Sequence, residues 1–483
     1  MQFLEEVHFQ KHMQKRLSRY RKIIDSNIKF GLAALILVVP LYPKFPFLNI
    51  PGTQVAIRLE DLLIFIVLAL WLFCSVEKIP KFMNNKIIIA FVLFWSISLV
   101  STFSGVFITQ TVSAHISFLH WMRRVEYMFG FIIALDVIKK RGDLAFYLKL
   151  LTIDLFIIFL FGLGQKYLNW PVITTQNAEY AKGVALRYIP GSHLISTFAG
   201  HYDLATYIVL MAPIFIVLSF GTRNVVDSVK IIKNSLVAKG IFLFISTISL
   251  WTLVNSASRI SIASYLGSVT LALIFIKKYR YIPVVIVASI LFISSSSNLI
   301  DRYMRIIEVT VQKVVGERGN IVELDLVYAA EDAPARRETK IPTPTPVPVF
   351  EDRSTSIRIN VEWPRALRAL KKNLILGTGY SSITLATDND YLRMLGEIGI
   401  LGTLSFSLVL AKIVYYLFAE LLRHGSKPSL ERYFVLAVLA AVPGVMLNMV
   451  FIDILEASKF AIMFWIILGL AISSANLLSN EKD

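Results

Sequence analysis

The segment KIIIAFVLFWSISLVSTFSG, residues 86–105, carries a single charge, at its first residue. A helix of about 20 residues covers the roughly 30 Å of hydrocarbon in a lipid bilayer. Lipid offers no hydrogen-bond partners to backbone N–H and C=O groups, so a crossing segment must satisfy them within a helix. This stretch therefore predicts a membrane-spanning helix.

Similar segments recur along the 483 residues, of which 56% are hydrophobic, against about 45–50% in a typical soluble domain. The predicted spans are residues 29–44, 60–76, 86–105, 119–138, 145–166, 201–220, 238–256, 260–277, 281–297, 390–418, 432–452 and 457–477. The first contains Pro40 and Pro43, and the fourth contains charged residues. We predict an all-α polytopic membrane protein with about twelve transmembrane helices.

The net charge of +16 is explained by the short loops between these spans. Basic residues stand before the first span and after the second, fourth, sixth, eighth and tenth. Short loops rich in Lys and Arg stay in the cytoplasm, and one orientation satisfies all of them. It places both termini in the cytoplasm and the chain in the cytoplasmic (inner) membrane, with the lipid bilayer rather than a nucleic acid as its partner.

This orientation divides the chain into a cytoplasmic basic N-terminal segment (1–28), spans one to nine (29–297), a large external loop (298–389), spans ten to twelve (390–477) and a cytoplasmic tail (478–483). Within the loop, the tract IPTPTPVPV at 341–349 predicts an extended spacer. Residues 355–373 have helical periodicity despite Pro364. The Gly-Thr-Gly sequence at 377–379 predicts a turn back toward the membrane.

Charged residues inside the fourth predicted span are candidates for function, because ionisable groups are costly at membrane depth. The sequence there reads Arg123-Arg124-Val125-Glu126-Tyr127. On a helix, Arg123 and Glu126 share a face. Two interpretations are open at this point, an interhelical ion pair inside the bundle and a ligand-binding role.

Three further polar residues fall on the predicted outer face. Arg259 lies in the tight turn between spans seven and eight, and is either a snorkelling side chain bonded to lipid phosphate or a functional residue. Arg187 precedes the segment that enters the sixth span. His201, at the start of that span, is either a base or a structural hydrogen-bonding residue.

The strongest local pattern is the acidic sequence DNDY at residues 388–391, which opens the tenth span at its outer end. Aspartate at a helix start is favoured by capping and by the helix dipole. Asp388 is therefore either a structural helix cap or part of a site where a hydrophilic acceptor meets a lipid-linked donor.

Taken together, these residues resemble the O-antigen ligase and polymerase superfamily, which are GT-C-type integral-membrane glycosyltransferases. The resemblance covers the back two-thirds of the chain. The motifs that carry it are Arg187 with Phe198 and His201-Tyr202-Asp203-Leu204-Ala205; Ser258-Arg259; Ser356, Arg358, Trp363 and Ala366-Leu367 with Gly377-Thr378-Gly379; and Asp388-Asn389-x-Tyr391-Leu392 with Glu397, Gly399 and Gly402.

The resemblance implies glycan transfer on the outer face of the membrane, in the assembly of surface polysaccharide of the cell envelope. The donor would be a glycan on undecaprenyl pyrophosphate, the acceptor a glycan, lipid or protein, and neither a metal nor a cofactor would be required. Arg187, Arg259 and Arg358 would bind the pyrophosphate, since Arg makes bidentate phosphate contacts.

The resemblance also assigns the chemistry. The ligase branch has a histidine as general base where this chain has Asp388, which favours a polymerase or a divergent member. Asn389 and Tyr391 belong to the same motif. Arg123, Glu126 and His201 are possible supporting residues. Direct attack by the acceptor predicts an inverting glycosyltransferase.

Two other classes of protein remain as alternatives. A transporter or flippase would have broken helices and polar groups at the bilayer midplane. A non-catalytic membrane scaffold would bind polysaccharide through the outer loop without turnover.

Overall fold

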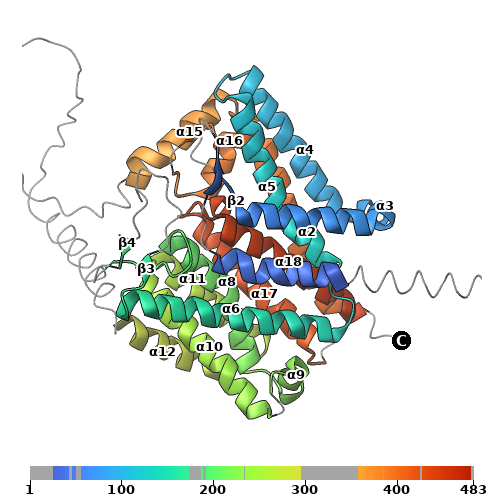
Figure 1. Cartoon of the computed structure of the whole chain (residues 1–483), viewed down its shortest axis with the longest axis vertical. Coiled ribbons are helices and arrows are strands. Elements are labelled where there is room, and N and C mark those ends of the chain that lie inside the picture. The colour runs from blue at the N-terminus through green and yellow to red at the C-terminus, as the bar shows by residue number, and fades with distance from the viewer. Residues whose placement is uncertain are drawn as a thin grey trace, which may run out of the picture.

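The computed structural model describes residues 26–42, 46–50, 56–172, 186–188, 192–232, 234–294, 357–384, 386–424 and 427–479. These residues are mainly helical (Figure 1). The helices are Ser26–Leu41, α2 (Leu59–Ser75), α3 (Ile79–Met83), α4 (Lys86–Phe107), α5 (Ala114–Leu135), α6 (Arg141–Tyr167), α8 (His201–Ser219), α9 (Arg223–Val229), α10 (Ser235–Ser256), α11 (Arg259–Phe275), α12 (Ile282–Ser294), α15 (Trp363–Lys372), α16 (Asp390–Arg423), α17 (Leu430–Met449) and α18 (Ser458–Ser479).

Shorter elements connect these helices. Strand β1 (Pro46–Asn49) pairs antiparallel with β2 (Ala56–Arg58), and β3 (Pro171–Val172) pairs antiparallel with β4 (Leu186–Arg187). Single helical turns cover Val76–Lys78, Tyr279–Tyr281 and Ile454–Glu456, and a π-helical turn, Arg358–Glu362, leads into α15. The helix predicted after the proline-rich tract is therefore present from residue 357, whereas the tract itself lies outside the described residues.

Each of the twelve predicted spans coincides with a helix. Among the described residues, seven helices are long and apolar enough to cross a membrane, namely α4, α6, α8, α10, α16, α17 and α18. The helices at the first, eighth and ninth predicted spans are apolar but shorter. Helix α2 has only 17 residues, and α5 carries charges in its first half. The chain is thus a multi-pass helical membrane protein, and twelve crossings stay a prediction.

The helices run between two ends of the bundle, which we call the site end and the basic end. At the site end, Lys166 at the close of α6 contacts Asn255 at the close of α10 (2.6 Å). At the basic end, Lys78 after α2 pairs with Asp136 after α5 (2.7 Å). In Figure 1 the site end, with β3, β4 and α15, lies to the left, and α3 lies to the right. The basic loops predicted to be cytoplasmic follow helices that finish at the basic end.

Helix α18 lies at the centre of the bundle and is almost wholly buried. It packs against α5 through one glycine on each helix. A Cβ atom on Gly469 would come within 2.5 Å of the Phe131 carbonyl oxygen, and one on Gly130 within 2.9 Å of Ile466. Close contact through small residues is typical of membrane helix pairs, which cannot rely on the hydrophobic effect for association.

Helix α16 is broken near its start. Gly399 has φ +67° and ψ −172°, which separates a short first segment, 390–398, from the longer helix that runs on to Arg423. The turn at 377–379 fills this break. Thr378 N–H donates to the Gly396 carbonyl (3.0 Å) and Gly379 N–H to the Glu397 carbonyl (2.8 Å). Helix α16 begins at residue 390, where the tenth span is predicted to begin, but its unbroken part begins only at residue 400.

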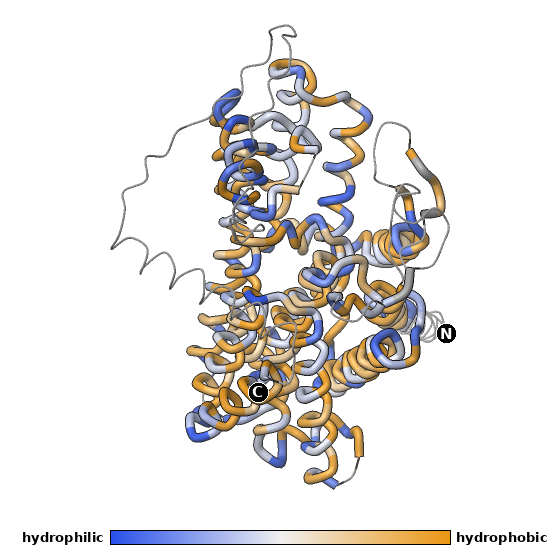
Figure 2. Tube along the Cα trace, turned by 90° about the vertical axis from the view of Figure 1, so that its left-hand side faces the viewer, coloured by the Kyte–Doolittle hydropathy of each residue, from blue (hydrophilic) through white to orange (hydrophobic). Residues whose placement is uncertain are grey.

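The break is also sealed from its other side. Ile400 N–H donates to the Leu374 carbonyl (3.0 Å) and Leu401 N–H to the Ile375 carbonyl (3.1 Å). A helix break leaves backbone groups without intrahelical partners, and the loop 374–379 supplies those partners here. Figure 2 shows that hydrophilic residues gather in the upper part of the molecule, where α15 lies in Figure 1, while the bundle below is mainly hydrophobic.

Candidate functional site

Asp388 and Arg358 form an ion pair at the site end, on the loop before α16. The Arg358 Nη2 and Nε atoms donate to Asp388 Oδ2 at 2.9 and 3.0 Å. The two side chains are 12% and 27% exposed, so the pair is shielded but reachable. Burial raises the pKa of the Asp388 carboxyl above its ordinary value, and the guanidinium opposes that shift only in part. The sequence motifs that contain these residues therefore converge on one place.

A stack of rings adjoins this ion pair. The Tyr202 hydroxyl accepts a long hydrogen bond from Arg358 Nη2 (3.5 Å). The His201 ring lies 4.0 Å from the Tyr202 ring and the His193 ring 4.2 Å from that of His201, between centroids. His201 is thus in the neighbourhood of Arg358, with Tyr202 between them.

The backbone at Asp388 is in the left-handed region, with φ +48°. The helix cap is the next residue, because the Asn389 side chain accepts from Leu392 N–H (2.9 Å). This arrangement answers one question left open by the sequence, since Asn389 caps α16 and the Asp388 side chain points to Arg358. Left-handed backbone is uncommon outside glycine, and such conformations persist where surrounding contacts impose them.

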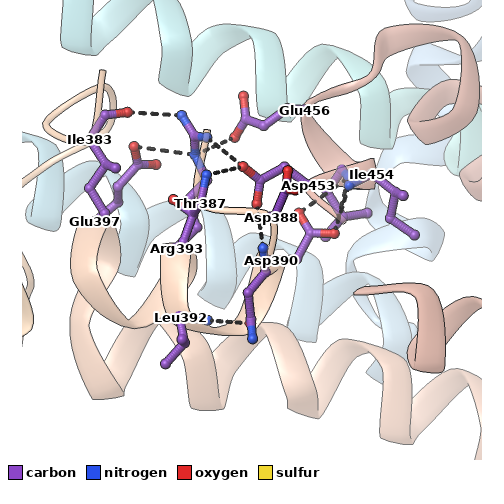
Figure 3. A network of polar contacts seen from close by, with 12 residues as sticks. Ile383, Thr387, Asp388, Asp390, Leu392, Arg393, Glu397, Asp453, Ile454 and Glu456 are labelled. Atoms are coloured by element: carbon purple, nitrogen blue, oxygen red, sulfur yellow. Dashed lines mark hydrogen bonds and ion pairs between the residues drawn. The ribbon is translucent and has the colours of Figure 1, made fainter. Parts of the chain in front are cut away.

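Those contacts form a reciprocal clamp between the loops before α16 and before α18 (Figure 3). Asp453 accepts from Thr387 N–H (2.7 Å) and Asn389 N–H (3.0 Å), the amides on either side of Asp388. In return, Asp390 accepts from Ile454 N–H (2.9 Å). Each loop thus supplies a carboxylate that binds backbone amides of the other.

Arg393 lies at the centre of the clamp. Its guanidinium donates to Asp453 Oδ2 (3.0 Å) and to the Ile383 carbonyl (3.0 Å), and it lies 3.2 Å from Glu456. Arg124, on α5, also pairs with Glu456. Buried charges of this kind are stable only when they are paired and hydrogen-bonded. The clamp therefore ties the Asp388 loop to the core of the bundle.

A small cavity lies beneath the clamp. Arg124, Asp390, Arg393, Glu397 and Glu456 provide its polar lining. Its volume of about 40 Å³ has room for a few water molecules at most. A sugar does not fit there, so the exposed side of the Asp388–Arg358 pair is the better candidate for a glycan.

The other predicted residues lie apart from this pair. Arg123 donates to Asp61 (3.0 Å) and to the Ala56 carbonyl (2.9 Å). The contact with Asp61 agrees with the interpretation of Arg123 as part of an interhelical ion pair. Glu126 follows one turn later on α5. The Tyr391 hydroxyl donates to the Met446 carbonyl (3.1 Å) and so joins α16 to α17.

Two of the predicted arginines lie at the site end. Arg259 begins α11, directly after a turn in which the Asn255 carbonyl accepts from Leu194 N–H (3.0 Å), next to His193. Arg187 ends β4, and its side chain lies outside the described residues.

Four residues of the site were not predicted from the sequence: Glu362, Arg393, Asp453 and Glu456. Glu362 follows Arg358 by one turn, and burial, with the charge of Asp388 second, raises the pKa of its carboxyl. Asp453 and Glu456 occupy the short turn between the last two predicted spans. Charged residues in so short a turn between two spans could have indicated a functional site, as the position of Arg259 did.

Changing Asp453 to asparagine is expected to loosen the Asp388 loop. The variant removes the charge that faces Arg393, and breaking a buried ion pair costs about 3–5 kcal/mol. We expect a lower Tm of the purified protein and faster hydrogen exchange at residues 387–389. Asp227→Asn, at an exposed residue of α9, is the control and should change neither quantity. Unchanged exchange in Asp453→Asn would show that the clamp does not hold the loop.

Comparison with known families adds one match. Residues 244–407 match the family described as O-antigen ligase, and no curated protein matches the chain. The match confirms the predicted resemblance to the O-antigen ligase and polymerase superfamily. It covers about a third of the chain, from α10 into α16, rather than the back two-thirds. Arg259, Arg358 and Asp388 fall inside it, whereas Arg187 and His201 precede it.

Proposed function

We propose that this multi-pass membrane protein transfers or polymerises glycan from undecaprenyl pyrophosphate at Asp388. The O-antigen ligase domain at residues 244–407 supports a glycan ligase or polymerase role. The observation that carries this is the Asp388–Arg358 pair, a half-buried carboxylate with a cation beside it inside the family domain. A base and an anion-binding group side by side suit a transfer from a pyrophosphate leaving group.

Asp388 is the general base of the proposed reaction. Arg358 binds the Oδ2 atom, so Oδ1 accepts the proton of the acceptor hydroxyl as that oxygen attacks the anomeric carbon. The raised pKa of the carboxyl favours this role, because a base works best when its pKa lies near the working pH. One C–O bond forms to the acceptor while the C–O bond to the pyrophosphate breaks, which inverts the anomeric carbon.

The arginines stabilise the leaving group. Negative charge develops on the departing pyrophosphate, and preorganised cations facing it lower the barrier without a metal ion. The Arg358 guanidinium has five N–H donors, and Asp388 and Tyr202 engage only part of them. Arg259 and Arg187 approach the same end of the bundle and would complete the pyrophosphate site. The acceptor is a glycan, a lipid or a protein.

This function requires the site end to face outward from the cytoplasmic membrane. The distribution of charge supports that orientation, because the basic loops follow helices that finish at the opposite end. Residues 298–389 then form an external loop, and both termini are cytoplasmic. Such an enzyme takes part in polysaccharide assembly at the cell envelope.

The break at Gly399 is a feature that would favour a transporter, since transporters bind substrates at broken helices. In those proteins the freed backbone groups face a cavity. Here loop 374–379 occupies them, so the break supports the loop rather than a transported substrate. Ion-driven uptake by proteoliposomes would favour this alternative.

Changing Arg259 to alanine is expected to lower transfer by about 10²–10³-fold, the usual cost of removing one group that stabilises developing charge. The measurement is the lipid-linked glycan profile of cells that produce each variant. Accumulated single repeat units indicate a lost polymerase, and accumulated full-length chains indicate a lost ligase. Arg223→Ala, at an exposed arginine of α9, is the matched control. A normal profile in Arg259→Ala would remove this residue from the pyrophosphate site.

A further inference from the structure

The helical stretch from residue 357 to the end of α15 leaves several apolar side chains uncovered. Each is at least 40% exposed: Ile357, Ile359, Val361 and Leu367 in the helical stretch, and Leu374 and Ile375 in the turn that follows it. The opposite side of α15 is buried, since Ala366 packs against Gly396 of α16. One side of this helix therefore holds it to the protein and the other is open.

Three exposed basic residues, Arg368, Lys371 and Lys372, lie on the open side. Positions 367, 368, 371 and 372 follow one another at helical spacing within α15, so Leu367 lies on the same face as these cations. No ion pair within the described residues involves any of the three. We call this surface, with the apolar residues above, the α15 face.

The α15 face continues the apolar surface of a membrane-spanning helix. Leu374 and Ile375 bind the amides of Ile400 and Leu401, at the start of the unbroken part of α16. Ile400, Leu401 and Leu404 are exposed large hydrophobic side chains. The helix from residue 400 to 423 is about 36 Å long at 1.5 Å per residue, enough to cross the hydrocarbon. Leu374 and Ile375 therefore lie level with the start of this unbroken helix.

We propose that α15 lies in the interface between membrane and water, with its apolar side chains in the acyl boundary and Arg368, Lys371 and Lys372 on the phosphates of anionic phospholipids. A helix with apolar residues and a basic border is the usual form of an interfacial helix. Lys and Arg extend their charged ends to the headgroups while their stems cover apolar surface. Each basic residue near an anionic surface strengthens binding by about fivefold.

The lipid contact would also set the height of the site. Arg358 lies one turn before α15 in the same helical stretch, so the bilayer surface fixes how far this guanidinium stands above the hydrocarbon. A pyrophosphate on a membrane-anchored lipid lies at that level. This last consequence rests on the proposed function, whereas the lipid contact itself does not.

A spin label tests the contact in the full-length protein. With the single cysteine removed by Cys74→Ser, a label is placed at Leu367→Cys or, as control, at Thr384→Cys, an exposed loop residue. The protein is reconstituted in vesicles of phosphatidylcholine with phosphatidylglycerol. We expect the label at 367 to be more accessible to oxygen than to a water-soluble nickel chelate, and the label at 384 to show the reverse. A water-exposed label at 367, or one that neither reagent reaches, overturns the proposal.

The charges are tested in the same experiment. Joint replacement of Arg368, Lys371 and Lys372 by glutamine, or omission of phosphatidylglycerol, should move the label at 367 toward water. Joint replacement of both lysines by arginine keeps the charge and should leave the label in place. If the glutamine variant keeps the depth of the native protein, anionic lipid does not bind this face. Since none of these measurements involves glycan transfer, failure here is distinguishable from failure of the proposed enzyme.

Discussion

Replacing Asp388 with asparagine is expected to lower glycan transfer by about 10²–10⁴-fold, the usual contribution of a general base. Asparagine has nearly the same shape but cannot take the proton of the acceptor hydroxyl. The fold should survive, because the clamp binds the backbone amides beside residue 388 and Asn389, not Asp388, caps α16. We expect near-native Tm together with accumulation of unused lipid-linked donor. Asp227→Asn controls for loss of a carboxylate elsewhere.

The pH dependence gives a second readout of the same residue. A general base must be deprotonated, so the rate should fall as pH drops through the pKa of Asp388. Burial raises that pKa, which places the acid limb of kcat/KM above the value of about 3.9 for an ordinary aspartate. Arg358 lowers the pKa through its charge, so Arg358→Gln should move the limb to still higher pH. A limb that stays fixed in Arg358→Gln, or full activity in Asp388→Asn, would mean that another group is the base.

The positions of the helices were predictable because each depends on local sequence. A block of apolar residues long enough to cross the bilayer must be helical wherever its neighbours lie. The turn at 377–379 was predictable for the same reason, since glycine spacing is a local signal. The break at Gly399 was not, because it depends on a loop that inserts alongside α16 and takes over its backbone hydrogen bonds.

The composition of the site was predictable only in part. Arg358 and Asp388 were assigned through motifs, and the structure brings them into contact across thirty residues of sequence. The partners of Asp453, at residues 387 and 389, are more than sixty residues away along the chain. Such pairings are set by how the spans pack, which no local pattern records. For Arg123, the same limit left two interpretations open until its contact with Asp61 was seen.

Glycine at 399 is required on two independent grounds. Its backbone lies in a region that essentially only glycine occupies, where another residue costs on the order of 1–3 kcal/mol. A Cβ atom there would also come within 2.3 Å of the Ile375 carbonyl oxygen and 2.5 Å of the Gly377 amide nitrogen. Both neighbours are backbone atoms and cannot rotate away. Relief of the contact would push loop 374–379 off the break and leave its hydrogen bonds unmade.

Gly399→Ala should therefore lower the Tm of the purified protein sharply and abolish glycan transfer, although residue 399 takes no part in the proposed chemistry. The displaced loop leads directly to Asp388, so the activity should be lost even at temperatures where the bundle remains folded. Gly267→Ala is the matched control, because a Cβ atom there meets nothing within 4 Å and alanine favours the α11 helix by about 1 kcal/mol. Equal Tm values for the two variants would mean that the loop does not depend on the break, and the account of how α16 positions the site would have to be abandoned.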